Sequence, residues 1–164
     1  MKLKDFLQRL PEPFAIELLE ALPAPDRREL LRRHGAKVAV SAGSLKRATR
    51  LSKEARLLVQ ALQRSDDPDE ARTFLQGWLA RRAEMVVHFL DAWKVKHQGG
   101  IVEDFSWVEK LEADTVKASL EGLDPKLEPI APLVYFVYLE LPVTERVLAV
   151  DALFKSLEQQ PSVE

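Results

Sequence analysis

The stretch DDPDEARTFLQGWLARRAEMVVHFLDAWKVKHQGG, residues 66–100, carries the clearest helix signals in the sequence. Asp67 is a favourable N-cap, and Pro68 is a favourable first helical residue because it lacks the N–H that a helix start leaves unpaired. Bulky apolar residues then recur at helical spacing until the glycine pair at 99–100, which accepts the left-handed backbone of a helix end. We therefore predict one long central helix over about 68–97.

Start and stop signals of the same kind predict helices along most of the chain. The stretch VYFVYLEL, 134–141, favours a β-strand by propensity. Because no second convincing strand exists for it to pair with, we interpret it as part of a buried helix. The stretch AKVAVSAG, 36–43, is interpreted as a linker. The other predicted helices lie at about 13–22, 25–34, 44–64, 106–122, 131–141 and 144–159.

The predicted fold class is all-α: a single compact domain of six to eight helices over residues 1–160, with a disordered tail at 161–164. The chain has 164 residues, of which 46% are hydrophobic and 30% charged, the balance of an ordinary globular protein. It contains no cysteine, which excludes disulfides, thiolate metal sites and cysteine nucleophiles. The longest apolar run, IAPLVYFVYL at 130–139, is too short to span a bilayer. By elimination, we expect a cytoplasmic protein with no membrane partner.

Charge is distributed unevenly along the chain. Residues 27–64 carry eleven basic and two acidic side chains, whereas residues 101–164 carry thirteen acidic and five basic ones. Such separation indicates either a charged partner or two parts of one fold that attract each other. On the helix predicted at 44–64, the apolar residues share one arc and the basic residues lie on the other. We predict a partner-binding surface made by Arg27, Arg28, Arg32, Arg33, Lys46, Arg47, Arg50, Lys53 and Arg64.

Two local patterns within this basic region resemble known motifs. ATRLSKEARLLVQAL, 48–62, superficially resembles the turn and recognition helix of a helix-turn-helix, but Arg50 stands where glycine is preferred and Arg56 where a buried aliphatic residue is expected. We therefore expect a continuous helix instead. ELLEALPAPDRRELLRR, 17–33, resembles the helical-hairpin repeats of flagellar motor-switch and magnesium-transporter N-terminal domains. This second resemblance implies a helical stack that binds protein.

The polar face of the long predicted helix raises the question of a metal or acid–base site. Glu84, His88 and Asp91 share this face, a combination that could ligate a metal. Helical metal bundles direct such ligands into the core, however, and these point away from the apolar arc. We expect a solvated face, with His88 contacting Glu84 and Asp91. Arg82 falls within the apolar arc, where we expect a snorkelling stem or a carboxylate partner; the alternative is an interface arginine stacked on Trp78.

No nucleophile elbow, glycine-rich phosphate loop or His-Glu-x-x-His motif occurs in the sequence. The sequence therefore predicts a non-enzymatic interaction protein without cofactor or metal, an adaptor or small subunit that docks onto an acidic surface of a larger protein. The alternative is a nucleic-acid-binding protein that contacts phosphates through the same basic residues.

Overall fold

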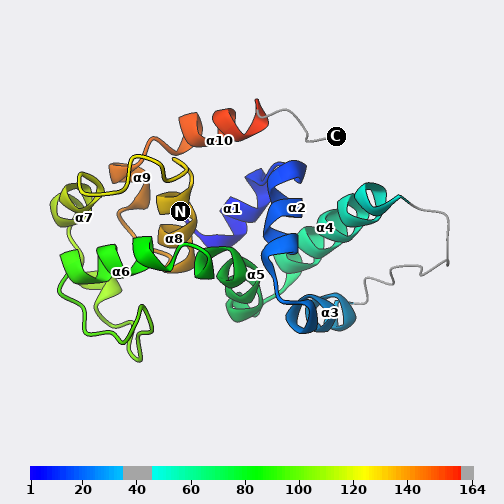
Figure 1. Ribbon diagram of the computed structural model, residues 1–164, viewed down its shortest axis with the longest axis horizontal. Coiled ribbons are helices and arrows are strands. Elements are labelled where there is room, and N and C mark those ends of the chain that lie inside the picture. Colours follow the sequence, from blue (N-terminus) through cyan, green and yellow to red (C-terminus); the bar gives the residue numbers. More distant parts are fainter. Residues whose placement is uncertain (35–45, 160–164) are drawn as a thin grey trace.

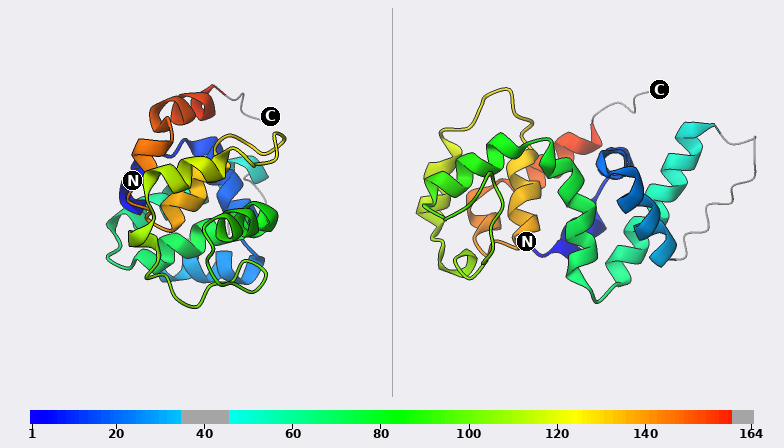
Figure 2. Two further views of the ribbon diagram at one scale, coloured as in Figure 1. Left: turned by 90° about the vertical axis from the view of Figure 1, so that its left-hand side faces the viewer. Right: turned by 60° about the horizontal axis from the view of Figure 1, so that its bottom comes forward.

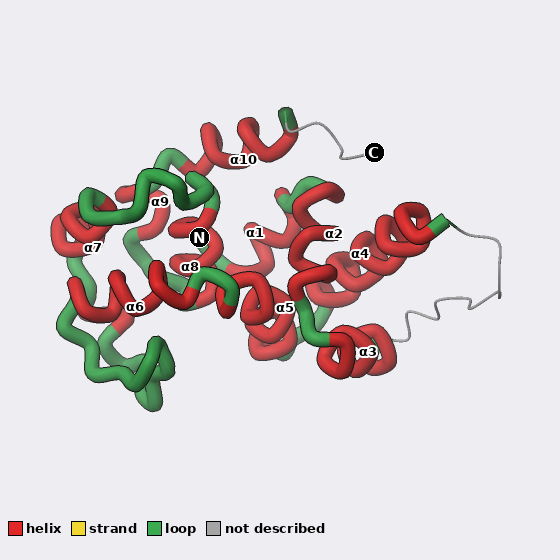
Figure 3. Tube along the Cα trace, viewed as in Figure 1, coloured by secondary structure: helices red, strands yellow, loops and turns green. Residues whose placement is uncertain are grey.

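The computed structural model describes residues 1–34 and 46–159 and confirms the all-α class. These residues form ten α-helices and one short 3₁₀ helix, η1, and no strand (Figures 1 and 3). The predicted linker at 36–43 and the predicted tail at 161–164 lie outside the described residues. In chain order the elements are α1 (Leu3–Arg9), α2 (Glu12–Ala21), α3 (Ala24–Arg33), α4 (Arg47–Arg64), α5 (Pro68–Ala80), α6 (Ala83–Ala92), η1 (Val108–Lys110), α7 (Ala113–Leu120), α8 (Ala131–Tyr138), α9 (Thr144–Val147) and α10 (Val150–Glu158).

The N-terminal helices gather around α4 and α5. Helix α2 packs against both α4 and α5, α1 packs against α4, and α3 contacts α4. Helix α4 is continuous, as expected, because Leu51, Ala55, Leu58 and Leu62 recur on one face and are all buried. In Figures 1 and 2, α3 and α4 lie at one end of the molecule and α6 and α7 at the other.

Helix α8 joins the two ends. It contacts α1 and α5 on the N-terminal side and α9 on the C-terminal side. All residues from 131 to 137 are buried, which confirms the interpretation of this apolar run as a buried helix rather than a strand. Beside it, Phe89 stacks on Trp93 and Tyr135, and the Trp93 and Tyr135 ring planes are inclined by only 4°.

The prediction of one long helix over 68–97 is wrong, because the helix is interrupted between α5 and α6. The backbone of Arg82 leaves the helical region, with φ −122° and ψ 34°. Its backbone N–H donates a hydrogen bond to the Leu79 carbonyl at 2.8 Å. In a continuous helix this N–H would donate to the Trp78 carbonyl, four residues earlier, but here the Arg82 guanidinium donates to that carbonyl at 3.1 Å. The side chain of Arg82 thus closes the end of α5.

The glycine pair does not end a helix either. Helix α6 stops at Ala92, and the left-handed residue that follows is Lys94, with φ 56°. Gly99 and Gly100, with φ 60° and 91°, instead form a two-residue turn between Gln98 and Ile101, whose backbones exchange two hydrogen bonds. Positive φ at both central residues is the requirement of a type I′ turn, so glycine fits both.

Other predicted boundaries also change. The helix predicted at 106–122 is divided into η1 and α7 by the extended residues Leu111 and Glu112. The helix predicted at 144–159 is divided into α9 and α10 by the extended Leu148. Helix α1 is absent from the sequence prediction. Its inner face consists of the buried residues Leu3, Phe6 and Leu7. None of the described helices has both the length and the apolar character needed to cross a membrane.

One glycine determines how closely two helices approach. A Cβ atom on Gly77 of α5 would lie 2.7 Å from the Ala21 carbonyl oxygen and 3.0 Å from the Leu22 Cα. Both are backbone atoms, so a side chain at this position would push the end of α2 away from α5.

Candidate interaction surface

The exposed side of α4 carries a line of cations. At about 100° per residue, Lys46, Arg50, Lys53 and Arg64 fall within an arc of about 60°, opposite the buried leucines. All four side chains are exposed. We call these four residues the basic stripe, which extends for about 27 Å at 1.5 Å per residue.

Two arginines of α4 have carboxylate partners. Arg47 donates a hydrogen bond to Glu20 of α2 at 2.9 Å, and it is directed toward that helix rather than into the stripe. Arg50 lies 3.6 Å from Glu54, one turn further along α4. Because both arginines are more than half exposed, these pairs contribute little to stability.

On α3, one glutamate pairs with two of the predicted site residues. Glu29 accepts two hydrogen bonds from Arg32, at 2.8 and 2.9 Å, and one from Arg33 at 2.9 Å. Arg33 also lies 3.9 Å from Glu70 of α5. Arg32 and Arg33 thus have carboxylate partners within the chain, and their place in the predicted surface stays a prediction.

The other predicted site residues have no such partner. Within residues 1–34 and 46–159, no carboxylate forms an ion pair with Arg27, Arg28, Lys46, Lys53 or Arg64. Arg28 instead donates to the Ala24 carbonyl of its own helix. Arg56, which the sequence prediction did not include in the surface, is also exposed and unpaired in this part of the chain.

Up to residue 159, the ion pairs of the acidic C-terminal part involve no residue of the basic stripe. These pairs are made elsewhere: Asp151 with Arg9, Glu140 with Arg72, and Glu128 with Arg82. Figure 1 shows α7 and α10 away from α4. Among the described residues, the basic side chains of α4 and the acidic side chains of the C-terminal part thus lie apart in the fold.

A measurement of the Glu29 pKa would test the hydrogen bonds that this residue accepts from Arg32 and Arg33. Hydrogen bonds from Arg32 and then Arg33 lower this pKa from 4.5 to about 2. Since the folded-state value is depressed, the pair stabilises the fold above the unfolded pKa and loses its effect as the pH falls toward 2. We expect a carboxyl NMR titration of Glu29 to have its midpoint near 2. In the double variant Arg32→Gln, Arg33→Gln the midpoint should rise toward 4.5, whereas a midpoint unchanged by these substitutions would contradict the assigned hydrogen bonds.

Glu84, His88 and Asp91 do not converge on one point, and the contacts expected among them do not form. The His88 ring nitrogen Nε2 lies 2.8 Å from the Ser119 carbonyl of α7, and the ring packs against Gly122. Asp91 pairs instead with His97, at 2.9 Å. Among the residues described, no group of three or more His, Asp or Glu side chains could hold a metal ion.

Arg82 has the carboxylate partner that we expected from its place in the apolar arc. Its guanidinium lies 3.2 Å from the Trp78 ring centroid, and it donates two hydrogen bonds to Glu128. Its side chain is only 12% exposed. By stacking on Trp78 and pairing with Glu128, Arg82 links α5 to the loop before α8, which is a structural role.

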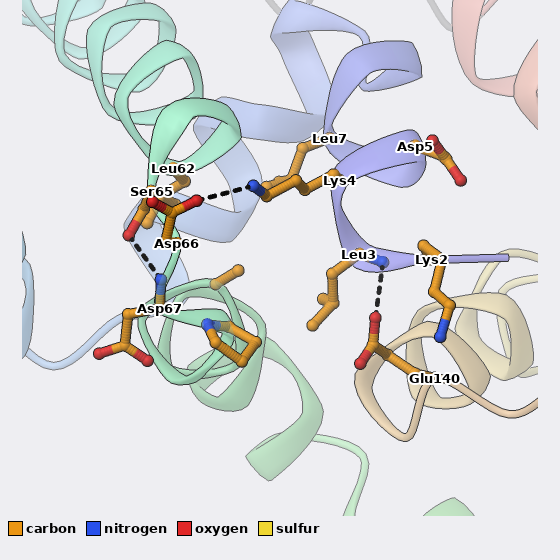
Figure 4. Close-up of a pocket in the computed structure, with 12 residues that line it drawn as sticks. Lys2, Leu3, Lys4, Asp5, Leu7, Leu62, Ser65, Asp66, Asp67 and Glu140 are labelled. Atoms are coloured by element: carbon orange, nitrogen blue, oxygen red, sulfur yellow. Dashed lines mark hydrogen bonds and ion pairs between the residues drawn. The ribbon is translucent and has the colours of Figure 1, made fainter.

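A pocket of about 410 Å³ opens where α1 meets the turn between α4 and α5 (Figure 4). Two of its charged groups have partners: Lys4 lies 3.6 Å from Asp66, and Glu140 accepts a hydrogen bond from the Leu3 backbone N–H. Sequence reasoning missed Glu140, which adopts a left-handed φ of 50° at the end of α8.

No protein-family model, curated protein or solved structure matches this chain.

Proposed function

We propose that this chain is a non-enzymatic interaction protein that docks onto an acidic surface of a larger protein through the basic stripe of α4, with Arg27 and Arg28 of α3 contributing. The observation that supports this most is the pairing pattern. Lys46, Lys53 and Arg64 have no carboxylate partner among the described residues, although the chain holds more acidic than basic side chains. A continuous helix that is buried on one side and cationic on the other fits helix-to-surface recognition.

Nucleic acid is the alternative ligand for the same residues. Proteins that bind single strands combine cations with aromatic side chains that stack on bases. The large exposed apolar side chains of the described residues are Ile101 and Phe105, and neither belongs to α3 or α4. The stripe therefore offers phosphate contacts without base stacking, so we favour the protein partner.

The test compares two variants with equal loss of positive charge. The stripe variant carries Lys46→Gln, Lys53→Gln and Arg64→Gln, and the control carries Lys117→Gln, Lys126→Gln and Lys155→Gln, all exposed residues of the C-terminal part. Each tagged protein is used to recover partners from native host lysate, with and without nuclease. We expect recovery by the stripe variant to fall on the order of tenfold, while the control equals the wild type.

The outcomes separate the two ligands. Proteins recovered equally with and without nuclease, and lost with the stripe variant, support a protein partner. Recovery that disappears after nuclease assigns the stripe to nucleic acid, in which case affinity should also fall steeply with salt. Equal recovery by the stripe and control variants would overturn the proposed surface.

A further inference from the structure

Ile101 and Phe105, on the loop that follows α6, are the exposed large apolar side chains of the described residues. They are 74% and 48% exposed. Both border a groove between this loop and helices α5, α6 and α8; the loop is drawn at the lower left of Figure 3. The groove consists of two adjoining hollows of about 330 and 360 Å³ that share Gln76, Phe105, Tyr138 and Leu139.

The loop is ordered by its own contacts. The turn at Gly99 and Gly100 fixes Ile101 through paired backbone hydrogen bonds with Gln98. Further along, Ser106 donates its N–H and its hydroxyl to Asp104, at 2.9 and 2.6 Å. A loop that is already ordered loses little conformational entropy when it binds, so its exposed side chains are available to a partner at low cost.

Tyr135 adds a polar group to this apolar groove. Its side chain is only 4% exposed and lines the groove from α8. Burial, and to a lesser degree Tyr138, raises the pKa of its hydroxyl, and no hydrogen bond contributes to that shift. The hydroxyl therefore remains protonated at neutral pH.

The charged residues between Ile101 and Phe105 in the sequence, Glu103 and Asp104, are both negative. Glu103 is exposed and has no ion pair within residues 1–34 and 46–159. Hydrogen bonds from Ser106, with a smaller effect of Lys110, lower the pKa of Asp104, which therefore stays ionised. The cation that lines the groove, Arg72, is already held by Asp69 at 2.8 Å and by Glu140 at 3.3 Å.

We propose that this groove binds a segment of another protein in which bulky apolar side chains are flanked by lysine or arginine. Apolar side chains of the segment would cover Ile101 and Phe105, and its cations would lie against Glu103 and Asp104. A second copy of this chain using the same groove is disfavoured, because two-fold pairing would bring these carboxylates together. The surface is independent of the basic stripe, and the two together would allow this chain to bridge two partners.

The test uses the full chain and three labelled synthetic peptides of equal length. The first is an amphipathic leucine–lysine peptide, the second has glutamate in place of lysine, and the third has serine in place of leucine. Fluorescence anisotropy measures affinity, and amide NMR shifts locate the bound peptide. We expect binding of the leucine–lysine peptide alone, with shifts at residues 99–105 and in α8. The double variant Ile101→Ser, Phe105→Ser should weaken it at least about tenfold.

A matched pair of charge reversals tests the electrostatic part. Glu103→Lys should weaken binding about threefold to tenfold, whereas Glu121→Lys, at an exposed position near the end of α7, should leave it unchanged. Equal weakening by both reversals, or NMR shifts that avoid the groove, would overturn the proposal. So would a wild-type dimer in sedimentation that the Ile101→Ser, Phe105→Ser variant converts to a monomer, since the groove would then be filled by a second copy.

Discussion

Replacement of Trp78 by alanine is expected to lower the free energy of unfolding by about 3–5 kcal/mol. Trp78 is 1% exposed, and its ring meets that of Phe14 edge-on at 5.4 Å between centroids. The substitution leaves a cavity between α2 and α5 and also removes the ring on which Arg82 stacks. Because whole domains have stabilities of about 5–15 kcal/mol, this single change should remove a large share. Urea denaturation followed by far-UV circular dichroism measures it.

The matched variant Trp78→Phe keeps an aromatic ring beneath Arg82 but removes the indole N–H that donates to Glu17. Its loss should be smaller, about 1–2 kcal/mol, because Glu17 is half exposed and can bind water instead. If Trp78→Ala lowered the free energy of unfolding by less than about 1 kcal/mol, the described packing would be contradicted. So small an effect would require that the site around the ring relaxes to fill the cavity or already contains water.

Gly77→Ala is expected to destabilise the protein, against the usual trend within helices. Alanine is normally favoured over glycine in a helix interior by about 1 kcal/mol. Here the added Cβ would meet backbone atoms of α2 at 2.7 and 3.0 Å, and such overpacking costs about 1–3 kcal/mol or more. We expect a net loss of about 1–2 kcal/mol, measured by the same denaturation experiment.

The neighbouring substitution Gln76→Ala provides the control, because Gln76 is exposed on the same helix and should change stability by no more than about 0.5 kcal/mol. If Gly77→Ala stabilised the protein as much as helix propensity alone predicts, α2 and α5 could not be as close as the structure places them.

The elements that could be predicted from sequence are those whose signals are local. Asp67 accepts the Asp69 N–H as an N-cap at the expected start of α5, and the leucines of α4 face inward at their helical spacing. The break at Arg82 could not be predicted in this way. At the break the Arg82 guanidinium bonds to Glu128, which is 46 residues distant along the chain, so local sequence signals do not indicate this contact. The glycine pair was misread because both a helix end and a type I′ turn require positive φ.

The same distinction applies to the candidate surface. The pairs of Glu29 with Arg32 and Arg33 have three- and four-residue spacing, so the sequence already contained the signal that these cations pair within their own helix. The pair of Arg47 with Glu20 joins two helices and required their packing to be known. The groove bordered by Ile101 and Phe105 is made by α5, α6 and α8 together, so only the folded arrangement brings its walls into contact.

The placement of the three tryptophans gives the protein two separate optical reporters. Trp78 lies between α2 and α5, whereas Trp93 and Trp107 pack together near α8, with ring centroids 5.8 Å apart. Indole emission depends on local polarity, so single-tryptophan variants would record the loss of order at each end of the molecule separately. Because α8 contacts helices on both sides, we expect superimposable melting curves from the two reporters, which would show that both ends unfold as one cooperative unit.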